Sequence, residues 1–113
     1  MHEMAIARGI LDIALAAAEK EGAKRILRVN VVAGELRGIL LLQLTFCFSL
    51  MAEETIAKDA DLNLEITPIR GKCQECAETF IVEDYCYQCP KCGSRDIQVI
   101  GGTELRVRDI EVE

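Results

Sequence analysis

The sequence has very few aromatic residues, no tryptophan and only one histidine among its 113 residues. Aromatic residues make up 4% of the chain and hydrophobic residues 50%, so the core must be aliphatic. The single histidine is residue 2, which leaves no histidine elsewhere to act as a general base. Because no phosphate-binding glycine loop of the Walker type is present either, the sequence predicts that the protein is not an enzyme.

Basic residues are also scarce, since 13 lysines and arginines stand against 19 aspartates and glutamates, for a formal net charge of −6. This charge repels a phosphate backbone, so we expect no nucleic-acid partner. The longest apolar run, residues 39–52, contains three polar residues and falls short of the roughly 20 that cross a bilayer. We see no secretory signal, and we expect a cytoplasmic protein that does not enter the membrane.

The spacing of apolar residues predicts two helices and three strands. In chain order the patterns cover residues 4–22 (helix), 25–33 (strand), 40–56 (helix), 62–67 (strand) and 105–112 (strand). In the last strand the apolar residues change parity, which predicts a β-bulge near Arg108 and Asp109. We therefore expect an α+β fold in which two helices pack on a small sheet of about three strands.

The second predicted helix is apolar on most of its surface. Such a helix is expected to be sandwiched between other elements or between two subunits, so the sequence leaves room for a homodimer. Cys47 lies within it, and we expect this cysteine to pack as a small hydrophobic residue.

The composition changes abruptly over residues 71–95, which contain five of the six cysteines and few aliphatic side chains. A segment with so few apolar groups cannot form its own core, so a metal must replace that core. We predict a zinc-ribbon module at 71–95 inserted into a second domain, which comprises residues 1–70 together with 96–113.

Two Cys-x-x-Cys pairs supply the predicted metal ligands, Cys73 with Cys76 and Cys89 with Cys92. Two such turns direct four sulfurs to one point, which completes the closed tetrahedral site that structural Zn²⁺ prefers. Iron, held as in rubredoxin, is the alternative metal.

Cys86 complicates the pairing, because it forms a further Cys-x-x-Cys with Cys89. We assign Cys89 to Cys92 because only that pair has the proline and the following glycine that shape a zinc knuckle. Cys86 is then expected to be a spare, half-buried thiol. A small redox protein that uses iron or Cys86 is a further hypothesis.

The first three residues, Met1, His2 and Glu3, offer a different set of metal ligands. The terminal amine, the amide nitrogen of His2 and its imidazole can chelate one ion in a plane, which suits Ni²⁺ or Cu²⁺ and not tetrahedral Zn²⁺. Glu3 can add a carboxylate ligand or orient the imidazole. The sequence therefore predicts a second metal site at the amino terminus.

Three features in this order resemble the HypA family of nickel metallochaperones for [NiFe]-hydrogenase. They are Met-His-Glu directly before a helix, Ala-Gly-Glu-Leu at residues 33–36, and a late ribbon that ends in Cys-Pro-Lys-Cys-Gly-Ser. The related HybF proteins are similar in the same features. The resemblance implies a chaperone that binds Ni²⁺ through Met1, His2 and Glu3 and holds a structural zinc on its four paired cysteines.

The resemblance also implies partners, namely a HypB-type GTPase and the hydrogenase large-subunit precursor, with urease served by some members. Certain archaeal members are thought to add a later histidine to the nickel site, and this chain has none, so the fourth nickel ligand stays open. The alternative function is a zinc-ribbon module for protein interaction or regulation that transfers no nickel.

Overall fold

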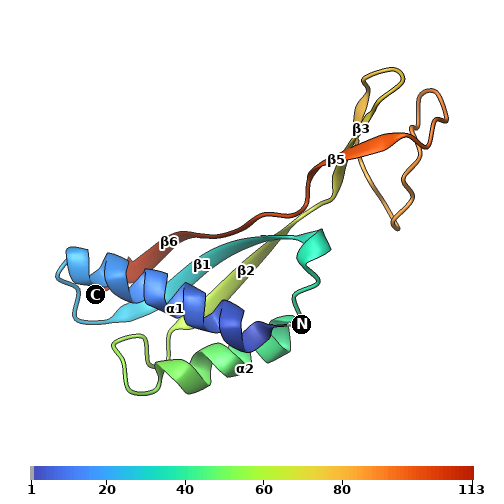
Figure 1. Ribbon diagram of the computed structural model, residues 1–113. Helices are drawn as coiled ribbons and strands as arrows, with labels where there is room; N and C mark the ends of the chain where they lie inside the picture. Colours follow the sequence, from blue (N-terminus) through green and yellow to red (C-terminus); the bar gives the residue numbers. More distant parts are fainter. Residues whose placement is uncertain (1) are drawn as a thin grey trace.

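The structure, a computed structural model, describes residues 2–113 (Figure 1). Its elements are, in chain order, α1 (Glu3–Lys20), β1 (Ile26–Gly34), the 3-10 turn η1 (Glu35–Arg37), α2 (Leu41–Ala52), β2 (Asp61–Thr67), β3 (Arg70–Cys73), β4 (Thr79–Ile81), β5 (Ile97–Gly101) and β6 (Leu105–Val112). The strands form two three-stranded sheets, ordered β2-β1-β6 and β4-β3-β5. The molecule is elongated, 54 × 26 × 16 Å, with the second sheet at the far end from the helices (Figure 1).

The first sheet is built around β1, which pairs with β2 in parallel and with β6 in antiparallel fashion. A parallel pair needs a crossover between its strands, and η1 with α2 provides it. Both helices lie on one side of this sheet (Figure 1). The predicted α+β fold, with two helices on a three-stranded sheet, is confirmed.

The core between the helices and this sheet is aliphatic, as the composition requires. Its largest fully buried members are Phe48, Leu11, Ile26, Leu44, Val29 and Val31. Each such side chain contributes about 1.5–3 kcal/mol when it is removed from water. The helical period of α1 directs Leu11 to this interior, and the alternation of β1 directs Val29 and Val31 to it. Ile26 reaches the same interior because a second bulge, at Leu27, changes the parity of β1 and leaves Leu27 exposed.

The predicted bulge in the last strand is confirmed. Val107 of β6 pairs with Val31, but the next pair is Asp109 with Asn30, so Arg108 is the extra residue. This insertion returns the later apolar residues of β6 to the helix-covered face.

The face of the sheet without helices is held by polar side chains. Asn30 is only 5% exposed, and its Nδ2 donates to Asp109 Oδ1 and to Glu111 Oε2. Asn63 on β2 donates from Nδ2 to the Asn30 side-chain oxygen at 3.1 Å. The side-chain amide of Asn30, on β1, therefore links all three strands. The hydrogen bond from Asn30, with the nearby Arg108, lowers the pKa of Asp109.

One expectation about α2 was wrong: within this chain, α2 is not sandwiched between other elements. It ends at Ala52 rather than at residue 56, and its neighbours are α1 on one side and β2 on another. Its inner residues are buried, but its outer apolar residues face outward: Leu42, Phe46 and Leu50. In the described part of the chain, neither helix combines the length and the apolar character needed to span a membrane.

The two sheets are joined where three backbone segments cross closely. A Cβ on Gly34, the last residue of β1, would lie 2.0 Å from the carbonyl carbon of Gly102. Gly102 has φ +102°, and a Cβ there would lie 2.7 Å from the Cα of Ile69. The N–H of Leu36 donates to the Gly102 carbonyl at 2.8 Å. Glycine is therefore required at both positions for the chain to close this crossing.

A single carboxylate holds the crossing together. Glu104 accepts hydrogen bonds from the Thr67 hydroxyl and from the N–H groups of Gly102, at 2.6 Å, and Thr103, at 2.9 Å. These donors lower the pKa of Glu104 to about 2, since they stabilise its charged form. The resulting stabilisation is complete above the ordinary carboxyl pKa and is lost as the pH falls towards 2.

The second sheet extends beyond the predicted cysteine module. Its strand β5 pairs with β3 in antiparallel fashion, with Cys73 opposite Ile97 and Arg70 opposite Gly101. The sheet thus spans residues 70–101, and the sequence patterns had not indicated strands β3, β4 or β5. The division of the chain into domains at residues 71–95 stays a prediction.

Two glycine-to-alanine variants test the crossing. We expect Gly34→Ala to destabilise the fold by at least roughly 2 kcal/mol, because the new methyl group meets rigid backbone. Gly9→Ala is the control, since no atom lies within 4 Å of a Cβ at that position in α1, and it should stabilise by roughly 0.5–1 kcal/mol. Urea unfolding measures both, and similar effects of the two changes would contradict the role of the crossing.

Candidate metal sites

The structure brings four cysteine thiols together at the far end of the second sheet. The sulfurs of Cys73, Cys76, Cys89 and Cys92 all lie within 4.8 Å of one another. Two of the separations are 3.5 Å, between Cys73 and Cys92, and 3.6 Å, between Cys76 and Cys89. Sulfurs bound tetrahedrally to zinc at 2.3 Å lie about 3.8 Å apart. The cluster therefore fits a structural zinc site of the ribbon type.

Both Cys-x-x-Cys segments adopt the same turn. The N–H of Ala77 donates to the Cys73 carbonyl at 2.9 Å, and the N–H of Gly93 donates to the Cys89 carbonyl at the same distance. Ala77 has φ +65° and Gly93 has φ +77°. The sequence indicated this turn only for Cys89 and Cys92, which Gly93 follows. After Cys73 and Cys76 the corresponding residue is an alanine, Ala77.

The backbone around the cysteines favours their thiolate forms, which are the metal-binding forms. Burial by itself raises the pKa of Cys89, but the N–H groups of Cys92 and Lys91, both 3.4 Å from its sulfur, and the neighbouring thiols lower that pKa to about 7. At Cys73, too, burial raises the pKa, yet hydrogen bonds from the adjoining turn lower it overall. At Cys76 and Cys92 a backbone hydrogen bond also lowers the pKa, but burial and the neighbouring thiols together raise it overall. The turns thus direct the ligands, and their N–H groups favour the thiolate forms.

Cys86 lies outside this cluster, and its thiol is exposed. The expectation of a half-buried Cys86 was wrong, because Cys86 follows an exposed turn. Asp84 and Tyr85 in that turn are exposed and both have positive φ, +52° and +56°. The residue lines a shallow pocket of about 370 Å³ with Arg95 and neighbouring residues.

The predicted amino-terminal site lies at the beginning of α1. His2 is exposed and immediately precedes the helix, and its carbonyl accepts the N–H of Ile6 at 2.9 Å. The first amides of a helix have no acceptor within it, so the N–H groups of His2 and Glu3 are not used by the helix. Met1, the third predicted nickel ligand, lies outside the described residues.

A pocket of about 410 Å³ opens beside these residues. It is lined by His2, Glu3, Met4, Ala5, Gln43 and Cys47. Within residues 2–113, the Oε2 atom of Glu3 is buried and has no hydrogen-bond partner. A buried carboxylate oxygen without a donor is costly, so this arrangement favours a bound donor or cation in the pocket.

Gln43 and Cys47 are pocket residues that the sequence analysis did not assign to a site. They are four residues apart in α2 and so share one face of that helix. Cys47 packs against the core as expected, and it also borders the pocket. No pattern in the sequence relates these residues to His2, because the packing of α2 on α1 brings them together.

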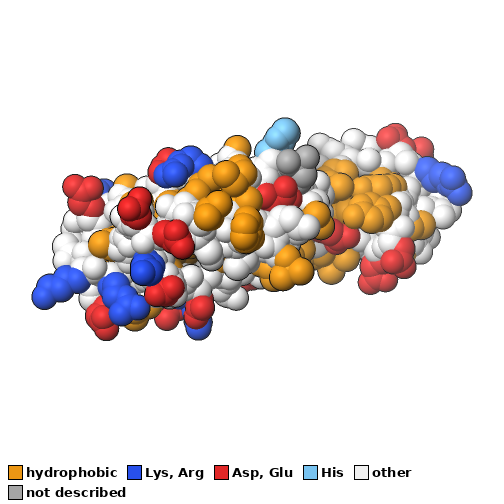
Figure 2. Space-filling model, turned by 90° about the horizontal axis from the view of Figure 1, so that it is seen from below, with side chains coloured by type: hydrophobic (Ala, Val, Ile, Leu, Met, Phe, Trp, Pro, Cys, Tyr) orange, Lys and Arg blue, Asp and Glu red, His pale blue; other side chains and the backbone are white. Residues whose placement is uncertain are grey.

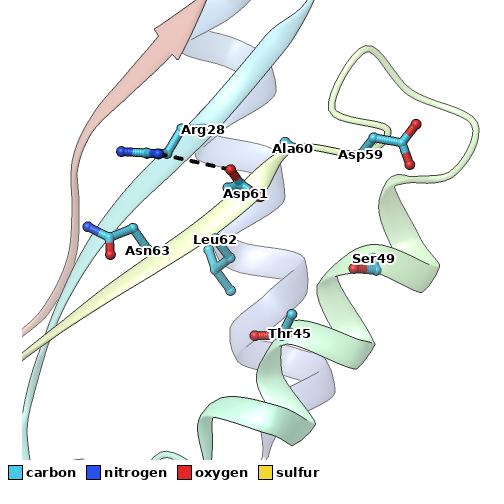
Figure 3. Close-up of a pocket in the computed structure, with 8 residues that line it drawn as sticks. All are labelled: Arg28, Thr45, Ser49, Asp59, Ala60, Asp61, Leu62 and Asn63. Carbon is cyan, nitrogen blue, oxygen red and sulfur yellow. Dashed lines mark ion pairs between the residues drawn. The ribbon is translucent and has the colours of Figure 1, made fainter.

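A second, larger pocket of about 550 Å³ lies between α2 and the start of β2 (Figure 3). Figure 3 shows hydroxyl groups of Thr45 and Ser49 on its helical side and the pair formed by Arg28 and Asp61 on the strands. The guanidinium nitrogen of Arg28 lies 4.0 Å from the carboxylate oxygen of Asp61, and both side chains are exposed, so this ion pair contributes little stability. Neither imidazole nor thiol lines this pocket, so the amino-terminal pocket is the better metal candidate.

Substitutions at Ala77 and Gly93, the residues with positive φ, test whether the two turns of the ribbon are equivalent. We expect Ala77→Gly to stabilise the ribbon by up to about 1 kcal/mol, because glycine adopts positive φ without steric cost. Gly93→Ala should destabilise it by about 1 kcal/mol for the opposite reason, since the space there is otherwise free. Thermal unfolding of the zinc-loaded protein measures both changes. A loss of stability in Ala77→Gly would contradict the equivalence of the two turns.

Known proteins resemble this chain over its whole length. Residues 1–112 match the family described as "Hydrogenase/urease nickel incorporation, metallochaperone, hypA". The hydrogenase maturation factors HypA of Prosthecochloris aestuarii and Geobacter sulfurreducens are each 40% identical over 100% of both chains.

Solved structures show the same fold. The solution structure of the Ni metallochaperone HypA from Helicobacter pylori is 26% identical, has a TM-score of 0.70, and covers 99% of this chain and 97% of its own. A second solution structure, of a HypA protein, is 27% identical with a TM-score of 0.75, and covers 100% of this chain and 97% of its own. The chain belongs to the HypA family, whose members are nickel metallochaperones and maturation factors for hydrogenase and urease rather than known enzymes.

Proposed function

We propose that this protein binds Ni²⁺ through Met1, His2 and Glu3 and delivers it, with a HypB-type GTPase, to the hydrogenase large-subunit precursor. The observation that carries the proposal is the pocket beside α1, which His2 and Glu3 both line and where the buried Oε2 atom of Glu3 has no hydrogen-bond partner among the described residues. Membership of the HypA family supports nickel as the ion and a hydrogenase, or a urease, as the destination.

The position at the beginning of α1 suits the chemistry of nickel. The amide nitrogens of His2 and Glu3 donate no helical hydrogen bond, so their deprotonation by the metal breaks none. With the imidazole and the amine of Met1 they provide nitrogen ligands near one plane, which Ni²⁺ accepts. The positive end of a helix disfavours a cation, and the negative charge of Glu3 in the first turn offsets this effect.

Release of the cargo follows from the same arrangement. The His2 side chain is exposed, so protons and a competing partner protein can both reach it. Its ligand nitrogens must be deprotonated to hold the metal, so protonation releases the ion. An exposed site of few nitrogen ligands therefore suits the transfer of nickel between proteins. The pocket walls formed by α2 offer the fourth ligand that the sequence left open.

The second part of the proposal is that Cys73, Cys76, Cys89 and Cys92 hold Zn²⁺ as a structural ion. The strands of the second sheet bury no large aliphatic side chain, and only Ile69, just before β3, and Val82, just after β4, are buried beside them, so the metal provides the missing core. Four thiolates close the tetrahedron and leave no open position for a substrate. The zinc thus maintains the shape of the ribbon.

Two exposed cysteines give a matched test of the zinc ligands. We expect Cys92→Ser to lose the single tightly bound zinc, because three thiolates with one weak oxygen ligand bind it far less strongly. Cys86→Ser, which changes an equally exposed thiol outside the cluster, should retain it. Metal analysis after dialysis against a chelator measures the zinc content. Zinc loss in Cys86→Ser would refute the assignment.

Nickel titration of tag-free, zinc-loaded protein tests the first part. One tight site is expected in the unaltered chain, and it should weaken at least tenfold in His2→Ala or when residues are added before Met1, since each change removes a nitrogen ligand. Glu3→Gln should weaken binding, whereas Glu53→Gln, a change of an exposed carboxylate at the end of α2, is the control.

Calorimetry gives the affinities of these variants. A tight nickel site that survives both His2→Ala and the extension would overturn the proposal. No tight nickel site in the unaltered protein would favour the alternative, a zinc-ribbon interaction module.

A further inference from the structure

The first turn of α1 directs Glu3 towards α2. Glu3, Ala7 and Leu11 are spaced four residues apart and therefore lie on one face of α1, and Ala7 and Leu11 on this face are completely buried. α1 packs against α2, and Figure 1 shows the beginning of α1 beside the first turns of α2. The carboxylate of Glu3 thus belongs to the face of α1 that meets α2.

The opposite wall of the amino-terminal pocket carries a thiol. Gln43 and Cys47 share one face of α2, and both line this pocket. Cys47 is half-buried and packs against the core, whereas Leu44 and Phe48, one position further along the helix, are buried completely. The Cys47 side chain is therefore held by the core on a regular helix and still borders the pocket.

Two helices thus bring an imidazole, a carboxylate, an amide and a thiol to one pocket, from His2, Glu3, Gln43 and Cys47. The Oε2 atom of Glu3 is buried and has no hydrogen-bond partner in the described part of the chain. A buried carboxylate oxygen without a donor indicates a ligand that satisfies it. This observation does not depend on Cys47, and it favours a cation in the same pocket.

Of the two α2 residues, Cys47 offers the ligand that suits nickel. A neutral amide oxygen, as in Gln43, suits hard ions such as Mg²⁺ and Ca²⁺, whereas a thiolate is a soft ligand. For sites built of nitrogen, oxygen and sulfur ligands, the affinity of divalent ions rises from Co²⁺ to Ni²⁺. A sulfur ligand therefore favours nickel over the hard cations that the Glu3 carboxylate by itself would attract.

His2 can complete the site by a rotation of its side chain. Among the described residues, only the four ribbon thiols lie close enough together to hold an ion without rearrangement. His2 is exposed and precedes α1, so its imidazole can turn towards α2 without breaking a helical hydrogen bond. Figure 2 shows this histidine, the single one of the sequence, projecting from the surface.

We propose that Cys47 supplies a sulfur ligand to the nickel ion that the amino-terminal residues hold from the other side of the pocket. This inference rests on the proposed function and deepens it. On binding, the Cys47 thiol gives its proton to the solvent and a bond forms between its sulfur and Ni²⁺, with no transfer of electrons. The ion then links the amino terminus to α2, and through α2 to the core.

Nickel titration of tag-free, zinc-loaded protein, followed by absorption, tests the sulfur ligand. An equimolar amount of Ni²⁺ should produce a thiolate-to-nickel charge-transfer band in the near ultraviolet, because nickel held only by nitrogen and oxygen ligands has no such transition. Cys47→Ser should remove this band and weaken nickel binding by roughly tenfold or more, since it replaces the soft ligand by a hydroxyl.

Two matched variants serve as controls. Gln43→Ala changes the same pocket wall without removing a sulfur, and Cys86→Ser removes an exposed thiol outside the pocket. Both should keep the charge-transfer band. Circular dichroism and zinc content show whether each variant is folded.

A second measurement uses the unaltered chain. Of the six cysteines, Cys47 and Cys86 lie outside the ribbon cluster. Nickel should slow the alkylation of Cys47 by iodoacetamide and leave the rate at Cys86 unchanged, as followed by mass spectrometry of the peptides. Equal rates at Cys47 with and without nickel would contradict the proposal.

The outcomes separate this inference from the function on which it rests. Tight nickel binding without a charge-transfer band, and with the same affinity in Cys47→Ser, would overturn the sulfur ligand and leave the amino-terminal nickel site standing. A band that persists in Cys47→Ser, or that appears together with release of zinc, would place the nickel on the ribbon thiols and also overturn the inference. The absence of any tight nickel site in the unaltered protein would overturn both.

Discussion

The close crossing of Gly34, Gly102 and Ile69 is the constraint on which the rest of the molecule depends. Three parts of the chain meet there: the end of β1, the link between β2 and β3, and the return from the cysteine ribbon. The Leu36 N–H bond to Gly102 and the charged Glu104 hold them together. Because the contacts are between backbone atoms, they leave no freedom for side chains to adjust, and glycine is the only residue that permits them.

The two proposed metal sites differ in a way that suits different tasks. The four thiols enclose a single point, two of them are buried, and backbone N–H groups donate to the sulfur of Cys89, so an ion held there is retained. His2 is exposed at the beginning of a helix, where backbone amides are free and a pocket admits a further ligand. In the proposed function, zinc in the closed sulfur site replaces a hydrophobic core, whereas the open amino-terminal site suits an ion that must leave.

α2 connects the fold with both the amino-terminal pocket and the surface. Its inner face fills the core, the side that carries Gln43 and Cys47 lines the pocket, and its outer stripe is uncovered. The apolar residues on its inner side follow from the core that they fill. Those on its outer side, Leu42, Phe46 and Leu50, are exposed and are not explained by contacts within the described chain.

The sequence by itself determined the local structure. The helical period of α1, the alternation of β1 and β2, and the bulge at Arg108 follow from spacing along one segment, and the Cys-x-x-Cys pairs indicated the ribbon in the same way. Only the tertiary structure decided which distant segments meet: β5 pairs with β3, Gly34 lies on Gly102, and Cys47 borders the pocket of His2. Residue spacing records the direction of a side chain within its own element, but contact across the chain depends on how whole elements pack, and no local pattern contains that information.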